Sequence, residues 1–388
     1  MKLYVYFIVL TGLILLTVTG CCNIPYNIHP ASTKNQSRCE AIMSNLAKND
    51  PNSKLTWFDA KVIGVEGKGW TDTEGYYERV PAKAKGILTN AALNYGKHSS
   101  GLYVRFVTDS NTISARWKLR NKELSMFHMT AVGVSGLDLY VHDNNTWRLV
   151  GIGRPLQFPV NECVLAGDII PGTYEYILYL PLYNTVEQLE IGVDPGSMFA
   201  KASKQTVKPI VFYGSSIVQG ACASRPGMSH VAILGRRMNR PTINFALAGN
   251  ALMEPEVADL LCELDPAVYV LDAVPNCHVG CLNANFEKFV VKIRSAHPDT
   301  PLIFFEEICY PNEFHTLQKP TQNDNITFLK LFKQLQDKGV KNIYYITSKD
   351  FIGTDGEAFV DLIHPTDLGF MRMADALEPV LKRAIKKE

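Results

Sequence analysis

Four short stretches of the sequence carry residue types that could together perform acyl transfer. Two adjacent serines, Ser215 and Ser216, follow an apolar run in "PIVFYGSSIV", and Asp361 and His364 stand in "DLIHP" near the C-terminus. A serine hydroxyl becomes nucleophilic when a histidine takes its proton, and a carboxylate fixes the tautomer of that histidine. A spacing of three lets Asp361 and His364 meet in one turn. The sequence therefore predicts Ser-His-Asp chemistry.

Acyl transfer also needs hydrogen-bond donors for the negative oxygen that develops on the carbonyl carbon. The two remaining stretches are "LAGNA", with Gly249, and "VPNC", with Asn276. The backbone N–H groups of Ser216 and Gly249 and the side-chain amide of Asn276 are the candidate donors. Every role in such a site then has a candidate residue.

The elements that must position these residues are strands of a parallel sheet. After about residue 205, apolar runs rich in β-branched residues alternate with helix-like stretches. The runs cover residues 210–213, 242–247, 268–274, 302–308 and 343–346. This alternation predicts a parallel sheet with helices on both faces. Ligands of such sheets lie beyond the carboxyl ends of the strands, and the four stretches follow the first, second, third and fifth runs.

The first half of the chain has a different pattern. Short alternating runs broken by turn residues, such as "GLYVRFVTDSNTISARWKLR", are typical of β-hairpins and predict an antiparallel β-sandwich. We expect this β domain over residues 50–200, a polar link "AKASKQTVK", and an α/β domain over residues 207–388.

The first residues have the composition of an export segment. "MKLYVYFIVLTGLILLTVTGCC" has an early lysine, an apolar stretch and small residues before Cys21, which predicts a signal over residues 1–22. "VTGC" resembles the bacterial lipobox, in which the cysteine is lipidated, so Cys21 is the expected lipid anchor and the only expected contact with a membrane. A soluble secreted protein and an uncleaved anchor helix are the alternatives. The expected location is the bacterial cell envelope, with periplasm and cell surface both open.

Composition argues against several classes of partner. The 39 Lys and Arg residues nearly balance the 38 Asp and Glu residues, so we expect no nucleic-acid partner. No glycine-rich phosphate loop is visible, and we expect no cofactor. Cys277 and Cys281 flank His278 in "NCHVGC", but further metal ligands are missing there, so no metal site is expected. The pairing of the cysteines stays open.

The region from about Pro209 to the C-terminus resembles the SGNH (GDSL-type) hydrolase family. That family has four sequence blocks centred on Ser, Gly, Asn and His, with an Asp three residues before the His. These positions correspond in order to Ser216, Gly249, Asn276 and the pair Asp361 and His364.

The resemblance also implies which serine attacks. The family's first block is Gly-Asp-Ser followed by Leu or Ile, so Ser216, which precedes Ile217, takes the place of the nucleophile. Ser215 replaces the aspartate of that block, and we expect it to be a supporting or packing residue beside the nucleophile. A second departure is Cys277, which stands where an aspartate often follows the asparagine. Neither departure removes a predicted catalytic or oxyanion residue.

The longer stretches "YGSSIVQGACASRPGMSH" and "DLIHPTDLGFMRMADAL" resemble a two-domain branch of this family from gut Bacteroidetes. The resemblance implies a flavodoxin-like three-layer hydrolase domain behind a jelly-roll-like β-sandwich. It also implies an exported esterase or acetylhydrolase that acts on an acylated carbohydrate or another small ester. A glycan-binding lipoprotein with an inactive hydrolase domain, a lipase and a thioesterase are the alternatives. The sandwich could bind glycan, shape the substrate site, or serve only as a packing partner that covers part of the hydrolase domain.

Overall fold

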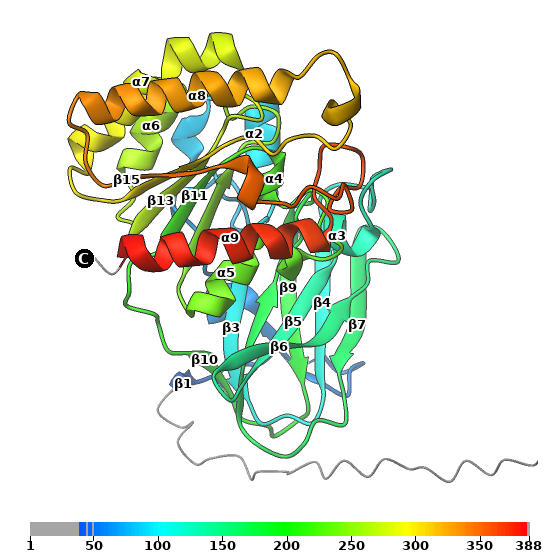
Figure 1. The fold of residues 1–388 in the computed structure, drawn as a ribbon. Helices are drawn as coiled ribbons and strands as arrows, with labels where there is room; N and C mark the ends of the chain where they lie inside the picture. Colours follow the sequence, from blue (N-terminus) through cyan, green and yellow to red (C-terminus); the bar gives the residue numbers. More distant parts are fainter. Residues whose placement is uncertain (1–38, 44–45, 49, 386–388) are drawn as a thin grey trace, which may run out of the picture.

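The computed structural model describes residues 39–43, 46–48 and 50–385, which form three β-sheets and their covering helices (Figure 1). The predicted export segment, residues 1–22, and its lipid anchor Cys21 lie outside the described residues and stay predictions. Within the described ranges, no helix has the length and apolar character needed to cross a membrane.

The C-terminal part of the chain, called here the α/β region, is built on one parallel sheet with the strand order β12-β11-β13-β14-β15. Its strands are β11 (Ile210–Gly214), β12 (Thr242–Ala246), β13 (Val268–Asp272), β14 (Leu302–Phe305) and β15 (Ile343–Ile346). All residues of β11, β12 and β13 are buried, as strands covered on both faces require. The predicted parallel sheet is confirmed.

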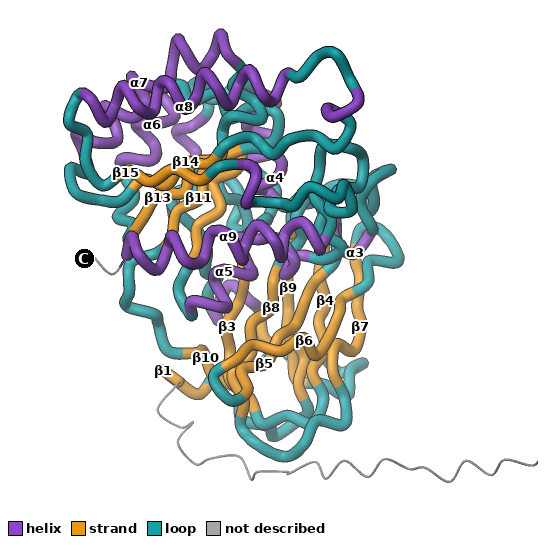
Figure 2. The backbone as a smooth tube through the Cα atoms, viewed as in Figure 1, coloured by secondary structure: helices purple, strands orange, loops and turns teal. Residues whose placement is uncertain are grey.

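Helices cover both faces of this sheet (Figure 2). One face carries α6 (Pro255–Cys262), α7 (Val279–Ala296) and α8 (Pro320–Asp337); the other carries α5 (His230–Met238) and α9 (Asp367–Ile385). Successive side chains of a strand point to opposite faces. Phe212 and Val270 accordingly belong to the core under α5 and α9, whereas Tyr213 and Leu271 belong to the core under α6, α7 and α8. The predicted three-layer fold is confirmed.

The N-terminal part, called here the sandwich region, holds two antiparallel sheets with the orders β1-β10-β3-β8-β5-β6 and β2-β9-β4-β7. Their strands are β1 (Cys39–Ile42), β2 (Thr56–Asp59), β3 (Tyr103–Thr108), β4 (Ile113–Leu119), β5 (Leu137–Asp143), β6 (Thr146–Gly153), β7 (Val160–Ala166), β8 (Tyr174–Tyr179), β9 (Val186–Val193) and β10 (Phe199–Ala202). Short helices α1 (Ala60–Ile63), α2 (Asn90–Gly96) and α3 (Ala131–Ser135) lie in the connections. Phe106, Trp117 and Leu178 are fully buried between the sheets. The predicted antiparallel sandwich is confirmed.

The polar link between the two regions begins later in the structure than the sequence predicts. Residues 200–202 belong to β10, which pairs with β3, so the connecting segment begins only after Ala202. The cause is Phe199, whose ring stacks on Phe58 and Phe106 with centroids 4.2 and 5.3 Å away. Burying this ring draws the following residues into the sheet.

Buried polar contacts join the two regions. The Arg79 guanidinium, from the sandwich side, donates to the carbonyls of Asn244 at 2.8 Å and Ala246 at 3.1 Å in β12. Burial lowers the pKa of Arg79 to about 10, so it stays charged at neutral pH. From the α/β region, Arg225 pairs with the fully buried Asp138 at 2.8 Å. Breaking such a pair leaves an uncompensated buried charge, so these contacts hold the two regions together.

Candidate active site

Ser215 and Ser216 lie where β11 ends and the short helix α4 (Ser216–Gln219) begins. The Ser215 hydroxyl accepts the Ile217 N–H at 3.2 Å and so caps this helix, and the Ser215 N–H donates to the Asp272 carbonyl at 3.0 Å. Ser215 is fully buried, whereas Ser216 is partly exposed. The capped turn thus presents Ser216 to solvent at the end of the strand.

A continuous chain of hydrogen bonds links Ser216 to Asp361. The Ser216 Oγ lies 2.9 Å from His364 Nε2, and His364 Nδ1 lies 2.8 Å from Asp361 Oδ2. The other Asp361 oxygen accepts the backbone N–H groups of His364 at 2.8 Å and of Ile363 at 3.2 Å. The turn closes through Leu362, whose φ is +71°.

The charge of Asp361 follows from these contacts. Burial alone raises the pKa of this carboxyl, but the hydrogen bonds and charge of His364 outweigh burial and bring the pKa below its ordinary value. Asp361 is therefore ionised at neutral pH. The arrangement can move a proton from the Ser216 hydroxyl to His364 while Asp361 stabilises the imidazolium.

Gly249 and Asn276 follow β12 and β13, the two strands beside β11. Gly249 has a φ of +69°, and a Cβ there would have no heavy atom within 4 Å, so its backbone conformation and not crowding requires glycine. Asn276 Oδ1 accepts the Ala251 N–H at 3.3 Å, which leaves the Asn276 amide N–H groups to donate elsewhere. Their role as oxyanion donors with Ser216 stays a prediction.

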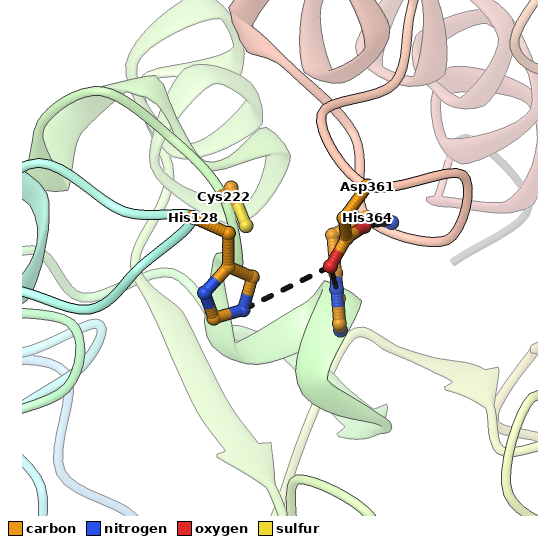
Figure 3. Close-up of side chains that lie close together, drawn as sticks. All are labelled: His128, Cys222, Asp361 and His364. Atoms are coloured by element: carbon orange, nitrogen blue, oxygen red, sulfur yellow. Dashed lines mark hydrogen bonds and ion pairs between the residues drawn. The ribbon is translucent and has the colours of Figure 1, made fainter.

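Two residues that the sequence did not single out lie against Asp361 (Figure 3). His128 comes from the sandwich region, and its Nε2 lies 4.0 Å from Asp361 Oδ2, with its ring centroid 5.3 Å from that of His364. Cys222 follows α4, and its N–H donates to the Pro365 carbonyl at 3.1 Å. No spacing in the sequence connects positions 128, 222 and 361, so only the folded chain reveals the group.

Both residues are uncharged at neutral pH. Burial, aided by the neighbouring His364, lowers the pKa of His128. Burial, aided by the negative charge of Asp361, raises the pKa of Cys222 to about 12. Asp361 is therefore the charged member of this group.

The loop that carries His128 also places an aromatic ring beside the site. Phe127 is 94% exposed, and its ring stacks on His128 with centroids 4.1 Å apart and an angle of 16° between the planes. An apolar ring this exposed is available to a ligand. The sandwich region thus contributes directly to the surroundings of the catalytic candidates.

A pair of buried acids lies behind the sheet end. Asp272 closes β13, and Glu307 follows β14 and accepts the Tyr310 hydroxyl at 2.6 Å. Burial raises the pKa of Glu307 to about 7. Burial, together with the charge of Glu307, raises the pKa of Asp272 well above its usual range. At least one carboxyl of this pair is therefore protonated near neutral pH.

Cys277 and Cys281, whose pairing the sequence left open, form a disulfide directly after Asn276. The bond leaves neither thiol to bind a metal. The intervening His278 bonds to Asp324, with 2.8 Å between Nδ1 and Oδ2.

A cavity of about 470 Å³ opens at the carboxyl ends of β14 and β15. Its lining includes the aromatic residues Tyr310, Phe314 and Phe359 and the acids Glu306 and Glu313. Phe359 pairs through its backbone with Pro365, directly after His364. The cavity therefore adjoins the loop that carries His364.

Comparison with known families accounts for both parts of the chain. Residues 207–382 match the GDSL-like lipase/acylhydrolase family, and residues 55–199 match the N-terminus of SGNH hydrolase-type esterases. No curated protein matches the chain.

Several solved structures share the fold. A GDSL-like lipase from Bacteroides ovatus is 34% identical, with 86% of this chain and 98% of that one covered and a TM-score of 0.81. The salicylyl-acyltransferase SsfX3 from a tetracycline biosynthetic pathway is 18% identical over 88% of this chain and 98% of that one, with a TM-score of 0.66. A family two carbohydrate esterase from Clostridium thermocellum, in complex with cellohexaose, is 15% identical over 74% of this chain and 93% of that one, with a TM-score of 0.54.

Proposed function

This chain belongs to the GDSL-like lipase/acylhydrolase (SGNH) family, and we propose that it is an exported serine esterase that removes short acyl groups, foremost O-acetyl groups, from carbohydrates. The observation that carries the proposal is the hydrogen-bonded chain from Ser216 through His364 to Asp361 at the end of β11. The family match supports a hydrolase, and the hydrogen-bonded Ser216, His364 and Asp361 support a serine mechanism.

The reaction has two halves. Ser216 Oγ attacks the ester carbonyl carbon while its proton passes to His364 Nε2, and the tetrahedral intermediate then expels the alcohol, which takes that proton from His364. The product of this half is an acyl-enzyme on Ser216. In the second half His364 takes a proton from water, the hydroxide attacks the acyl carbon, and the Ser216 oxygen leaves and is reprotonated.

The oxyanion of each intermediate needs donors that are already in place. We assign the backbone N–H groups of Ser216 and Gly249 and the Asn276 amide to this role, because they follow three adjacent strands. Asn276 supports the assignment because its carbonyl oxygen is already bonded to Ala251, so its amide N–H groups are the part available to substrate.

Three features support a carbohydrate ester as the substrate. Carbohydrate esterases of family two share the fold. The exposed Phe127 ring beside the site offers a flat apolar surface of the kind that stacks on a sugar. The cavity beside the His364 loop mixes aromatic rings with acids, which suits a polar group with apolar faces. On this reading the sandwich region shapes the substrate site.

The location of the protein is also a proposal. We propose that residues 1–22 direct export and that Cys21 carries a lipid, which places the esterase in the cell envelope. Labelling cells with a radioactive fatty acid should mark the wild-type protein and leave a Cys21→Ala variant unlabelled. Equal labelling of both proteins would contradict the anchor.

The esterase is tested by hydrolysis of p-nitrophenyl acetate, comparing wild type with Ser216→Ala and Ser215→Ala. We expect Ser216→Ala to lower kcat by about 10⁶-fold, toward the uncatalysed rate. Ser215→Ala removes only a helix cap, so it should cost about 1 kcal/mol of stability and retain most of the activity. Equal rates for wild type and Ser216→Ala would refute the serine mechanism.

The alternatives give different results in extended assays. A lipase should favour p-nitrophenyl octanoate over the acetate, and a thioesterase should favour acyl thioesters. A glycan-binding protein with an inactive hydrolase domain should bind oligosaccharides without turnover of any ester. If acetate is the preferred acyl group, the next substrates to test are acetylated xylan and mannan fragments, and the measurement is the release of acetate.

A further inference from the structure

His128, Cys222, Asp361 and His364 offer four metal-ligating atoms in one place, brought together from three separate segments of the chain. Figure 3 shows His128 and Asp361 facing each other across a gap, with the Cys222 sulfur beside it. All four donor atoms lie within 4.8 Å of one another. His128 and Cys222 have no part in the ester hydrolysis set out above.

The spacing of these atoms suits one tetrahedral ion. Zinc bonds of about 2.0–2.3 Å to nitrogen, oxygen and sulfur place any two ligands of the ion about 3.3–3.8 Å apart. The separations of 2.8 Å between His364 Nδ1 and Asp361 Oδ2 and 4.0 Å between His128 Nε2 and Asp361 Oδ2 lie on either side of that range. Side-chain movements of about 0.5 Å for the first pair and about 0.2 Å for the second would bring these two pairs into that range.

The His128 ring lies beside Asp361 without a hydrogen bond between them. Its Nδ1 is buried without a hydrogen-bond partner among the described residues, and the 4.0 Å from its Nε2 to Asp361 is too long for a hydrogen bond. The imidazole thus faces a carboxylate at the distance of a fellow ligand. A zinc ion bound between Nε2 and the Asp361 carboxylate would be within reach of both groups.

The donor set selects the metal. Two imidazoles, a thiolate and one carboxylate favour Zn²⁺, whereas Mg²⁺ and Ca²⁺ need oxygen ligands. Asp361 and a Cys222 thiolate would together supply two negative charges for the ion. The group can also be reached from solvent, because the side chains of His128, His364 and Asp361 are 12%, 17% and 20% exposed.

We propose that this group binds one Zn²⁺ ion and that the bound ion switches the hydrolase off; the inhibitory part rests on the proposed serine mechanism. On binding, the Cys222 thiol proton leaves to buffer and the His364 proton moves from Nδ1 to Nε2. Zinc then takes the place of the hydrogen bond between His364 and Asp361. His364 Nε2 carries a hydrogen toward Ser216 and can no longer accept its proton.

The test uses metal-free protein titrated with Zn²⁺ or with Co²⁺, which reports thiolate ligation through its charge-transfer absorption. Wild type should bind one ion, show the cobalt–thiolate band and lose at least 10-fold in p-nitrophenyl acetate hydrolysis, with recovery on adding EDTA. Cys222→Ala should keep its hydrolysis without metal, lack the band and bind Zn²⁺ at least 10-fold more weakly. The matched control is Cys262→Ala, which removes a half-buried thiol on α6 and should behave as wild type.

Several outcomes would overturn the proposal. Absence of the band in wild type, or an equal band in Cys222→Ala, would exclude Cys222 as a ligand. His128→Gln provides a second route if Cys222→Ala does not fold, and unchanged Zn²⁺ affinity in that variant would also overturn the site. The cobalt band does not depend on turnover, so an inactive wild type would refute the esterase and still leave the metal site tested.

Discussion

Replacing Asp361 by asparagine tests the proposed proton relay most directly. The asparagine oxygen can still accept the backbone N–H groups of His364 and Ile363, which lie 2.8 and 3.2 Å from Asp361 Oδ1, so the turn should persist. The new amide N–H₂ then faces His364 Nδ1 across 2.8 Å, where two N–H groups cannot both donate. His364 must move its hydrogen to Nε2, which faces Ser216 Oγ and can no longer take its proton.

The expected loss follows from this tautomer change. An aspartate-to-asparagine change in a serine triad lowers kcat by about 10⁴-fold, equivalent to about 5 kcal/mol of transition-state stabilisation. The assay is p-nitrophenyl acetate hydrolysis, with thermal unfolding to establish that the variant folds. Asp355→Asn is the matched control, because Asp355 bonds to Arg372 at the surface and should affect kcat less than twofold. A loss below 10-fold in a folded Asp361→Asn protein would refute the assigned role of Asp361.

Three further predictions concern the oxyanion, the buried acids and the contact between regions. Asn276→Ala should lower kcat by about 100- to 1,000-fold with little change in KM, and a change confined to KM would exclude it as an oxyanion donor. Glu307 has a folded pKa of about 7 against an ordinary 4.5, so the native state binds the extra proton and stability falls by about 3 kcal/mol as pH rises through this window. Urea unfolding of Glu307→Gln at pH 5 and pH 8 should show a smaller fall, with the buried Asp272 carboxyl supplying the remainder, and an undiminished fall would exclude Glu307 as a contributor. Arg225→Ala strands the buried Asp138 carboxylate and should lower the free energy of unfolding by about 3–5 kcal/mol, and a loss under 1 kcal/mol would mean that the pair does not join the regions.

The parallel sheet could be predicted because its strands are buried on both faces. Runs such as residues 210–213 and 268–274 are continuous, apolar and β-branched, a pattern that fits this setting. The rule that ligands lie beyond the strand ends then led to Ser216 and His364, which lie 148 positions apart in sequence and form a 2.9 Å contact. The order of the strands along the chain and the motifs that follow them were enough to predict that these two residues lie close together.

Other features depend on contacts that no local pattern records. His128 belongs to the sandwich region, and nothing about an isolated "FHM" indicates that its ring lies against Asp361. Phe199 was followed by polar residues that indicated a link, yet stacking on Phe58 and Phe106 made it part of β10. In both cases the decisive partner is distant in sequence. Tertiary packing, which periodicity does not report, determined the result.

The position of Arg79 has a consequence for self-association. β12 is the last strand of its sheet, and the Asn244 and Ala246 carbonyls, two residues apart, point away from β11. An open strand edge of this kind invites pairing with another chain. Arg79 donates hydrogen bonds to both carbonyls, so a strand from a second molecule cannot pair with them. Arg79 precedes β12 in the chain and is synthesised first. The residue that protects the open edge of β12 is therefore already present when that strand emerges.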